Sequence, residues 1–310
     1  MATEPLLKIG TRASPLALAQ THEAGDRLAA AAAELSGEGA VGVVEIKTTG
    51  DKVQDRPLAE LGGKGLFAKE LDSALLDGRI DIAVHSLKDL ETALPDGIVL
   101  GACLEREDPR DVLISPAAAD IDALPEGARV GTASLRRRAQ LLHRRPDLRM
   151  TLLRGNIQTR MRKIADGEAD ATFLALAGLN RMGLADRAAC VLDPDEMLPA
   201  CGQGAIGITC RTDDARALAW LAAVNHAETM IRVSAERAML AALDGSCRTP
   251  IGGLADIDAD GGLRLRGLVA RADGSEIHRG ERQGGIADAA ALGAELGAEL
   301  RARAGDDLFE

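Results

Sequence analysis

Aromatic residues are almost absent from this chain, which has three phenylalanines, one tryptophan and no tyrosine among 310 residues. Proteins that bind single-stranded nucleic acid stack bases on aromatic rings, and this chain has few rings to offer. The aromatic belts of membrane proteins are missing too, and no apolar run reaches the roughly 18 residues of a membrane-spanning helix. We therefore expect neither nucleic acid nor a membrane among its partners.

Paired cysteines and an export signal are also lacking. The five cysteines include no C-x-x-C pair, and their odd number does not suit a disulfide framework or a structural zinc site. The five histidines show no metal-ligand spacing, so no metal is expected. The N-terminus MATEPLLKIG has no basic segment followed by a long apolar one, which favours the cytoplasm as the compartment.

What remains is the composition of an ordinary globular protein. Apolar residues make up 46% and charged residues 27% of a chain whose length suits about two or three domains. The core must be built from aliphatic side chains. The net charge of −11 repels a phosphate backbone unless the basic residues are concentrated in one place.

Strand and helix patterns alternate along the first two thirds of the chain. The apolar run PLLKIGT leads to Ser14 and Pro15, which are typical of a helix N-cap and first turn. Further β-α-β repeats follow, and the polar run EREDPRD indicates a crossing between domains. These repeats predict two similar α/β lobes, with functional residues at the C-terminal ends of mostly parallel strands.

The final third has a different pattern. A helix is predicted from about Thr229 to Leu243, followed by Gly-rich alternating runs with the turn signal Asp273-Gly274. An Ala-rich terminal helix ends the chain. This order predicts a small α+β domain.

Basic residues are concentrated between Ser134 and Lys163, where nine arginines and one lysine face a single aspartate. Arginine binds carboxylates and phosphates through two parallel hydrogen bonds, so the segment predicts a polyanionic ligand. Two glycine-containing strand-to-helix junctions, GTASLRR and LRGNIQTR, add backbone N–H groups and helix dipoles. We expect ligand contacts from the arginines at these junctions, Arg136, Arg137, Arg154 and Arg160. We expect a solvated face for Arg138, Arg144, Arg145 and Arg162.

Two other segments have a similar position at strand ends. GTRAS at residues 10–14 combines a glycine turn, an arginine and a hydroxyl, although Ser14 alone is most simply a helix cap. HSLKD at residues 85–89 follows an apolar strand. Its Lys88 and Asp89 are either an ordinary ion pair or a reactive group in which the carboxylate stabilises a developing cation.

One cysteine differs from the rest in its setting. Cys247 lies in a Gly/Pro loop beside Arg248, and a nearby cation lowers a thiol pKa, so this thiol is the candidate nucleophile. Cys103 and Cys210 lie in strand-like runs and are expected to be inert. GGKGLF lacks the spacing of a phosphate loop, so we expect only that Lys64 and Phe67 face the ligand from a Gly-rich loop.

Nine motifs follow one another in a recognisable order. They are IGTRASPLALAQ, TTGDK, GGKGLFAKEL, DIAVHSLKD, VGTASLRRRAQL, LRGNIQTRMRK, LALAGLNRMGL, LPACGQGAIGI and ERAMLAALDGSCRTPIGG. Together they run from about Ile9 to Gly253 and resemble the porphobilinogen deaminase family, also called hydroxymethylbilane synthase. Nine ordered motifs are far more than chance supplies.

The resemblance implies an activity. The family consists of transferases of porphyrin and heme biosynthesis that condense four porphobilinogen molecules into the linear tetrapyrrole hydroxymethylbilane, with loss of ammonia. Synthesis takes place on a dipyrromethane cofactor that the enzyme builds from its own substrate and holds by a thioether to a cysteine, which Cys247 matches. The expected partners are therefore porphobilinogen and the growing pyrrole chain, and a monomer is expected.

The resemblance also implies three domains. Two are α/β lobes related to the type II periplasmic binding proteins, with a cleft between them, and the third is a small α+β domain. We place the first lobe at residues 1–104 and 203–224, the second at 105–202, and the third, which carries the cofactor cysteine, at 225–310. The first lobe is discontinuous because the GQGAIGI segment would return to it, which the residue pattern alone does not predict.

Site residues follow from the matching motifs. Asp89 matches the catalytic aspartate, which stabilises the cation left on a pyrrole nitrogen when ammonia departs. The residues implied in cofactor binding are Lys88, Asp89, Ser134, Arg136, Arg137 and Cys247. Those implied in substrate binding are Arg12, Ser14, Gln20, Lys64, Phe67, Arg154, Arg160 and Arg181. The acetate and propionate of each pyrrole account for the many arginines.

The chain departs from the family pattern beside two of these residues. Leu90-Glu91-Thr92 follows the aspartate where Val-Pro is usual, and Ser246 precedes the cysteine where glycine is common. The alternative function is a two-lobed binding protein for a small polyanion without chemistry. That alternative explains the lobes and the arginines but not a cysteine loop in a third domain.

Overall fold

The computed structural model describes residues 4–52, 67–243, 249–305 and 308. The chain divides into two units. Unit 1 lies within Met1–Val53, Gly63–Glu107 and Ala205–Met230, and unit 2 within Gln54–Gly62, Asp108–Gly204 and Ile231–Glu310. The chain thus leaves unit 1 after residue 107 and returns to it at residue 205.

Unit 1 is built on a sheet with the strand order β2-β1-β3-β10-β4. The strands are β1 (Leu7–Thr11), β2 (Val41–Glu45), β3 (Ile82–Ser86), β4 (Ile98–Cys103) and β10 (Ile206–Arg211). β1 pairs with β2 and β3 in parallel, whereas β10 is antiparallel to both β3 and β4. β10, which begins within the returning GQGAIGI segment, therefore lies between β3 and β4 in this sheet.

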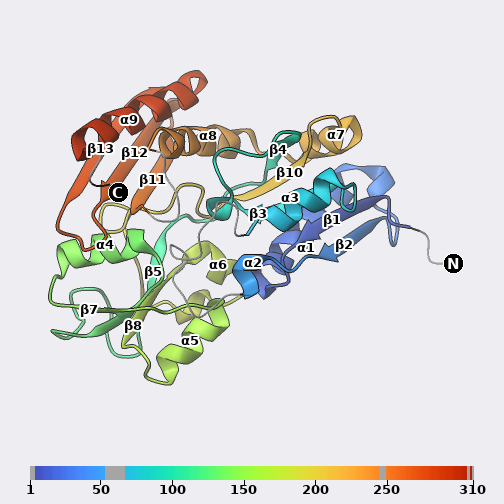
Figure 1. The fold of residues 1–310 in the computed structure, drawn as a ribbon. Helices are drawn as coiled ribbons and strands as arrows, with labels where there is room; N and C mark the ends of the chain where they lie inside the picture. Colours follow the sequence, from blue (N-terminus) through green and yellow to red (C-terminus); the bar gives the residue numbers. More distant parts are fainter. Residues whose placement is uncertain (1–3, 53–66, 244–248, 306–307, 309–310) are drawn as a thin grey trace. The chain divides into compact units, whose positions relative to one another are not determined.

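Helices cover both faces of the first sheet (Figure 1). Ile82 and Val84 pack with helices α1 (Pro15–Ala31) and α7 (Ala215–Val224), while Ala83 between them packs with α3 (Lys69–Leu76). This alternation is what a strand buried on both faces requires. Ser14 starts α1 as predicted, because its Oγ accepts a hydrogen bond from Ala17 N at 3.3 Å. The short helix α2 (Thr49–Lys52) follows β2.

Unit 2 contains a second sheet with a corresponding strand order, β7-β6-β8-β5-β9. Its strands are β5 (Asp111–Ile114), β6 (Arg129–Gly131), β7 (Arg149–Thr151), β8 (Ala171–Ala175) and β9 (Cys190–Val191). β6, β7 and β8 are parallel, and β5 is antiparallel to β8. In each sheet, the antiparallel fourth strand is the first one that the chain forms after crossing from the other unit. Helices α4 (Leu135–Arg144), α5 (Ile157–Ala165) and α6 (Leu176–Arg181) pack on its faces.

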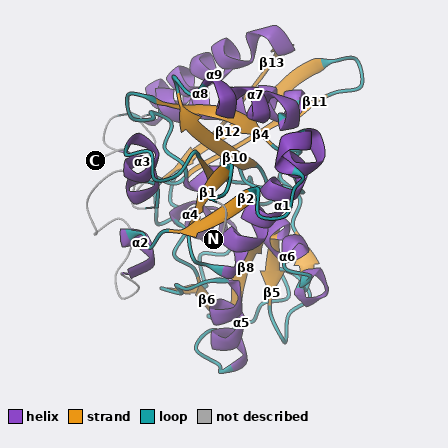
Figure 2. Ribbon diagram, turned by 90° about the vertical axis from the view of Figure 1, so that its right-hand side faces the viewer, coloured by secondary structure: helices purple, strands orange, loops and turns teal. Residues whose placement is uncertain are grey.

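The C-terminal part of unit 2 is an antiparallel sheet covered by helices. Strands β11 (Ile251–Ile257), β12 (Gly262–Ala270) and β13 (Ile277–Gly285) follow in order, and α8 (Ala227–Ala242) and α9 (Ala289–Ala304) lie beside them (Figures 1 and 2). The Asp273-Gly274 turn joins β12 to β13, and Gly274 has the positive φ of 76° that glycine tolerates. The predicted fold class, two α/β lobes with a small C-terminal α+β domain, is confirmed.

Several elements were not predicted. The helix α6 was missed because it follows β8 directly, within the apolar run ATFLALAGL. β9 has only two residues, and its pairing with β5 forms it. The helix α7 was also missed. The exact domain boundaries stay a prediction.

The backbones of α8 and α9 approach each other closely at two glycines. A Cβ atom on Gly293 would lie 2.2 Å from the carbonyl oxygen of Ala235, and one on Gly297 would lie 2.6 Å from that of Met239. Such distances are shorter than non-bonded contacts allow. Glycine is therefore required at these positions for packing.

We expect Gly293→Ala to lower the free energy of unfolding by about 1–3 kcal/mol, because the added methyl forces the two helices apart. The matched control is Gly25→Ala in α1, where the nearest side-chain atoms would be 3.7 Å from the new methyl. There, the higher helix propensity of alanine should stabilise the protein by up to about 1 kcal/mol. Urea unfolding followed by circular dichroism measures both, and an equal response of the two variants would contradict this account of the helix contact.

Candidate functional site

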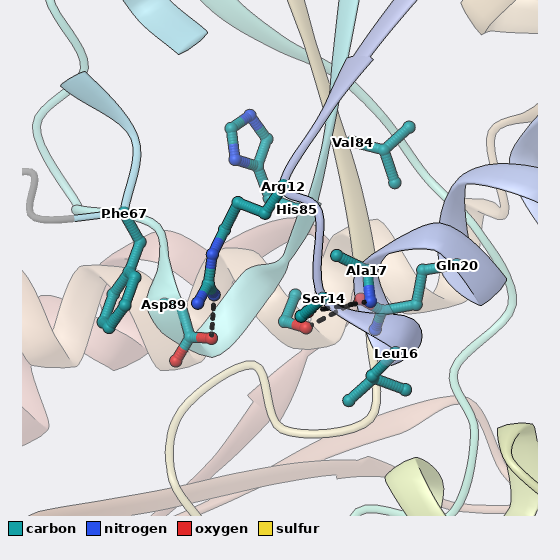
Figure 3. Close-up of a pocket in the computed structure, with 10 residues that line it drawn as sticks. Arg12, Ser14, Leu16, Ala17, Gln20, Phe67, Val84, His85 and Asp89 are labelled. Carbon is teal, nitrogen blue, oxygen red and sulfur yellow. Dashed lines mark hydrogen bonds and ion pairs between the residues drawn. The ribbon is translucent and has the colours of Figure 1, made fainter. Parts of the chain in front are cut away.

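A pocket of about 70 Å³ opens at the ends of β1 and β3 in unit 1 (Figure 3). It is lined by polar side chains that follow each strand and by the first turn of α1. The lining residues are Arg12, Ser14, Leu16, Ala17, Gln20, Phe67, Val84, His85, Ser86 and Asp89. Five of the predicted site residues, Arg12, Ser14, Gln20, Phe67 and Asp89, therefore share one pocket.

Arg12 is held between a ring and a carboxylate. Its guanidinium lies over the Phe67 ring, 4.1 Å from the ring centroid, and its Nη1 is 3.9 Å from Asp89 Oδ2. Figure 3 shows all three side chains on the same side of the pocket. The Asp89 side chain is 36% exposed, so a ligand can reach it. The structure therefore shows an ion pair of Asp89 with Arg12, a partner that the sequence did not indicate.

A tight turn fixes the position of Asp89. β3 is followed directly by the 3₁₀ turn Leu87–Asp89, in which Leu90 N donates to Leu87 O at 3.1 Å. Leu87 is 2% exposed, and its backbone N–H donates to Ala205 O at 3.0 Å, next to β10. The returning strand thus anchors the turn that carries Asp89 and the half-buried Lys88.

The pocket wall is formed by a hydrogen-bonded layer. Ser86 Oγ donates to Gln20 Oε1 at 2.8 Å, which joins the end of β3 to α1. His85 Nε2 lies 3.0 Å from Thr209 Oγ1 on β10. Gln20 and His85 are both buried, so these bonds keep polar groups satisfied under the pocket. His85 belongs to this wall, which the sequence analysis did not predict.

A second group of predicted residues lies in unit 2. Because β6, β7 and β8 are parallel, their C-terminal ends lie at one edge of the sheet. Ser134 follows β6, Arg154 follows β7, and Arg181 ends the helix that begins directly after β8. This edge therefore gathers hydroxyl and guanidinium donors from three strands.

Local hydrogen bonds shape this edge. Asn156 caps α5 by accepting from Thr159 N at 2.8 Å, and Gly155 before it has a φ of 121°, which favours glycine. Arg160 Nε donates to Gly155 O at 2.8 Å, and Arg181 Nη2 donates to Gly204 O at 3.0 Å. The half-buried Arg154, Arg160 and Arg181 are thus held close to the strand ends.

Arg136 and Arg137 were expected to face a ligand, but the structure places both in the interior of unit 2. Both are 5% exposed, and both bind the fully buried Asp111, with Nη1 of Arg136 and Nη2 of Arg137 each 2.7 Å from a carboxylate oxygen. Burial alone would raise the pKa of Asp111, but the two guanidinium groups outweigh it and hold the pKa well below its usual range. This ion triad forms part of the core of unit 2.

Of the four arginines expected on a solvated face, two are exposed and two form ion pairs within unit 2. Arg138 is exposed, as is Arg162. Arg144 binds Asp122 and Glu196. Arg145 binds Asp147 and donates to the carbonyl oxygens of Ile121 and Leu124 in the loop before β6. They hold the end of α4 in place.

The cysteines also fall into groups. Cys103 and Cys210 are buried, and burial raises the pKa of the Cys210 thiol to about 11, which leaves it protonated at neutral pH. Cys247 and Lys64 lie outside the described residues. Within the part of the chain that the structure describes, no helix has the length and apolar character to cross a membrane.

Two solved structures of binding proteins match part of the chain at low identity. The methionine-binding protein MetQ matches with a TM-score of 0.44 and 14% identity, over 72% of this chain and 91% of that one. A periplasmic substrate-binding protein from Coxiella burnetii matches with a TM-score of 0.43 and 17% identity, over 72% of this chain and 94% of that one. These scores are too low to support an inference about function, and the fold class rests on the strand orders above.

The fold and the pocket define an α/β protein of two lobes with an added α+β domain and a carboxylate at a strand end. Residues 7–219 match the family model "Porphobilinogen deaminase, dipyromethane cofactor binding domain", and residues 230–302 match "Porphobilinogen deaminase, C-terminal domain". The porphobilinogen deaminase of Nitrobacter winogradskyi is 56% identical over 307 residues, covering 99% of this chain and 96% of that protein. The chloroplastic one of Oryza sativa is 52% identical and covers 98% of this chain and 86% of that protein.

The chain belongs to the porphobilinogen deaminase family. It is therefore a transferase that uses a dipyrromethane cofactor, as the resemblance implied. The alternative of a binding protein without chemistry is not favoured by these comparisons.

The ion triad gives a test in which stability and binding roles differ. Arg137→Leu leaves Asp111 with a weakened counter-charge in the core, so we expect the free energy of unfolding to fall by about 3–5 kcal/mol. The neighbouring exposed Arg138→Leu should change it by at most about 0.5 kcal/mol. Urea unfolding at neutral pH compares them. Equal stability of the two variants would show that Arg137 is held for ligand binding alone.

Proposed function

We propose that Asp89 is the catalytic carboxylate of the reaction of this family, in which four porphobilinogen molecules are condensed into hydroxymethylbilane with release of ammonia. The observation that carries this proposal is the pocket of unit 1, in which Asp89 lies with Arg12 and Phe67 at the end of β3. It is supported by the motif DIAVHSLKD, which matches the family around its aspartate.

The loss of ammonia from porphobilinogen is helped by a carboxylate beside the reacting pyrrole. Loss of ammonia from the aminomethyl group of porphobilinogen leaves an azafulvene whose positive charge is on the pyrrole nitrogen. A fixed carboxylate beside that nitrogen stabilises the charge as it develops. The turn Leu87–Asp89 is anchored by the buried Leu87, so Asp89 needs little reorganisation during the reaction.

Arg12 supplies a positive charge for a substrate carboxylate at the same pocket. The Phe67 ring packs against its guanidinium at 4.1 Å and limits the directions that the side chain takes. We propose that Ser14 and Gln20 line the substrate position, because both lie at the first turns of α1 along the pocket wall. Lys64 stays a proposal from its motif.

The residues of unit 2 fit a polycarboxylate cofactor. When bound, dipyrromethane supplies the pyrrole to which the first substrate unit is joined. Its acetate and propionate groups suit Ser134 at this edge, and we propose that Arg154, Arg160 and Arg181 bind the same groups on the substrate and the growing pyrrole chain. We propose that Arg136 and Arg137 support this edge through Asp111, and that Lys88 assists beside Asp89.

Compartment and assembly belong to the same proposal. We propose a cytoplasmic monomer that acts on porphobilinogen and the growing pyrrole chain, without nucleic acid or a membrane. The net charge of −11 and the four aromatic residues support it, since both disfavour nucleic acid as a partner.

We expect Asp89→Asn to reduce turnover at saturating porphobilinogen by at least about a hundredfold, as loss of one group that stabilises transition-state charge costs roughly 3–4 kcal/mol. The amide keeps the shape and one acceptor oxygen but removes the charge. The measurement is single-turnover addition of a pyrrole to cofactor-loaded enzyme, with loading checked first by intact mass.

Asp96→Asn is the matched control, because Asp96 is an exposed acid that follows on the same loop outside the pocket. Its turnover should equal that of the wild type. A loaded Asp89→Asn enzyme that works within a fewfold of the wild type would remove Asp89 from the mechanism.

We propose that Cys247 carries the cofactor, because a thiolate captures an azafulvene carbon as a thioether. Intact mass of the purified wild type should show two porphobilinogen units, less two ammonia. Cys247→Ser should lack this adduct and lose at least about a hundredfold in activity, since a hydroxyl is a far weaker nucleophile. Cys190→Ser, at the half-buried Cys190 of β9, should keep the adduct. Full adduct on Cys247→Ser would disprove the attachment.

A further inference from the structure

Glu70 joins two segments of unit 1 that lie far apart in the sequence. Its Oε1 accepts a hydrogen bond from the backbone N–H of Thr49 at 2.9 Å and another from the Thr49 hydroxyl at 2.6 Å. Thr49 begins the short helix α2 after β2, and Glu70 lies in the first turn of α3. One carboxylate oxygen therefore ties the chain after β2 to the start of α3.

The contact with Thr49 is the only hydrogen-bonded contact of this side chain among the residues that the structure describes. Glu70 is half-buried, and its Oε2 is buried and accepts no hydrogen bond there. Replacing Oε2 by an amide nitrogen would thus break neither bond, whereas removing the side chain would break both.

Both of the joined segments lead to the pocket of unit 1. Phe67 lies three residues before Glu70, and its ring packs against the Arg12 guanidinium at 4.1 Å from the ring centroid (Figure 3). Arg12 directly follows β1, which pairs with β2 along its length. Beyond the paired residues, Ile46 N donates to Thr11 O at 2.8 Å.

These contacts close into a ring. From the backbone of Arg12 the ring runs through β1 and the end of β2 to Thr49, and it returns through Glu70 and Phe67 to the Arg12 guanidinium. Neither Thr49 nor Glu70 lines the pocket. The ring can therefore be opened at this contact without changing a residue that a ligand touches.

Apolar packing alone leaves the start of α3 less well defined. Leu71, Ala74 and Leu75 pack with Ile46 and Ala83 in one buried cluster. Such packing is non-directional, so it holds the helix on the sheet without fixing the orientation of its first turn. Hydrogen bonds to a carboxylate are directional and stronger than those between neutral groups, so they supply the missing constraint.

We propose that Glu70 is a positioning residue of the reaction, which holds Phe67 against Arg12 by binding Thr49. This inference rests on the role proposed above for Arg12 in binding a substrate carboxylate. Without the bond, the Arg12 guanidinium takes more orientations, and fewer of them suit the substrate. Asp89 is held by its own anchored turn and keeps its place.

The first test is the kinetics of the cofactor-loaded, full-length enzyme. Glu70→Ala should raise KM for porphobilinogen at least fivefold and change kcat less than twofold, because the affected contact binds substrate and transition state alike. Glu70→Gln keeps the acceptor oxygen and should have a KM within twofold of the wild type. The matched control is Asp77→Ala at the other end of α3, where the side chain is 63% exposed, and it should behave as the wild type.

Thr49→Val gives a second variant that serves even if Glu70→Ala does not fold. It removes the hydroxyl but leaves the backbone N–H, so we expect about a twofold rise in KM. Combined with Glu70→Ala it should add nothing further, because both changes break the same contact.

Fluorine NMR tests the positioning without reference to activity. The chain has three phenylalanines, so labelling with 4-fluorophenylalanine gives three signals, and Phe67→Leu identifies the one from Phe67. Glu70→Ala should shift this signal in the same direction as Arg12→Leu, which removes the guanidinium. Glu70→Gln and Asp77→Ala should leave it at the position of the wild type.

The proposal is overturned if Glu70→Ala changes neither KM nor the Phe67 signal while Arg12→Leu changes both. It is also overturned if Glu70→Gln is as impaired as Glu70→Ala, or if Glu70→Ala lowers the melting temperature and leaves KM unchanged. If Arg12→Leu leaves KM unchanged, the proposed role of Arg12 fails, and the fluorine signal still decides whether Glu70 positions Phe67.

Discussion

The carboxylate of Asp111 is completely buried, and its charge is neutralised by two arginines of unit 2. A charge in the interior is stable only when it is paired and fully hydrogen-bonded. Arg136 and Arg137 supply the charge, Nη1 of Arg136 also donates to Leu198 O, and Nη1 of Arg137 donates to Phe173 O. One carboxylate thus connects β5, α4, β8 and the segment that leads back to unit 1.

The same carboxylate also fixes the two crossings of the chain. Gln203 Nε2 donates to Asp111 Oδ1 at 3.0 Å and to Pro109 O at 2.7 Å. Pro109 lies where the chain enters unit 2, and Gln203 where it leaves. Because α4 is held by the same group, the position of Ser134 at its N-terminus depends on this buried triad. Burying three charges costs free energy of desolvation. The ion pairs and hydrogen bonds that oppose this cost also fix the position of the sheet edge.

The buried ion triad of unit 2 and the Arg12–Asp89 pair of unit 1 differ in their exposure to solvent. In unit 2 the charges of the triad are buried and neutralise one another. In unit 1 Asp89 is partly exposed, and its Oδ2 lies 3.9 Å from Nη1 of Arg12. An exposed pair of that kind contributes little to stability, so it can exchange partners with a ligand. The buried Leu87 and the Gln20–Ser86 bond keep the backbone beneath it in place.

Local sequence patterns predicted what depends on local interactions. The Ser14 cap and the Gly274 turn are set by residues within a few positions of one another, so motif and spacing suffice. The motifs likewise gathered Arg12, Phe67 and Asp89 in one pocket. The patterns failed where the interacting residue is distant in the sequence. The motif GTASLRR is compatible both with an anion-binding site and with a buried ion triad, because only the fold brings Asp111 to its arginines.

The position of β10 has a consequence for the order in which the chain completes its structure during synthesis. The sheet of unit 1 needs residues 206–211 between β3 and β4, so it stays open until two thirds of the chain has left the ribosome. The second sheet uses only residues 111–191 and has all of its strands earlier. The lobe that begins second is therefore the first whose strands are all present, and the N-terminal lobe carries an unpaired β3 edge in the meantime.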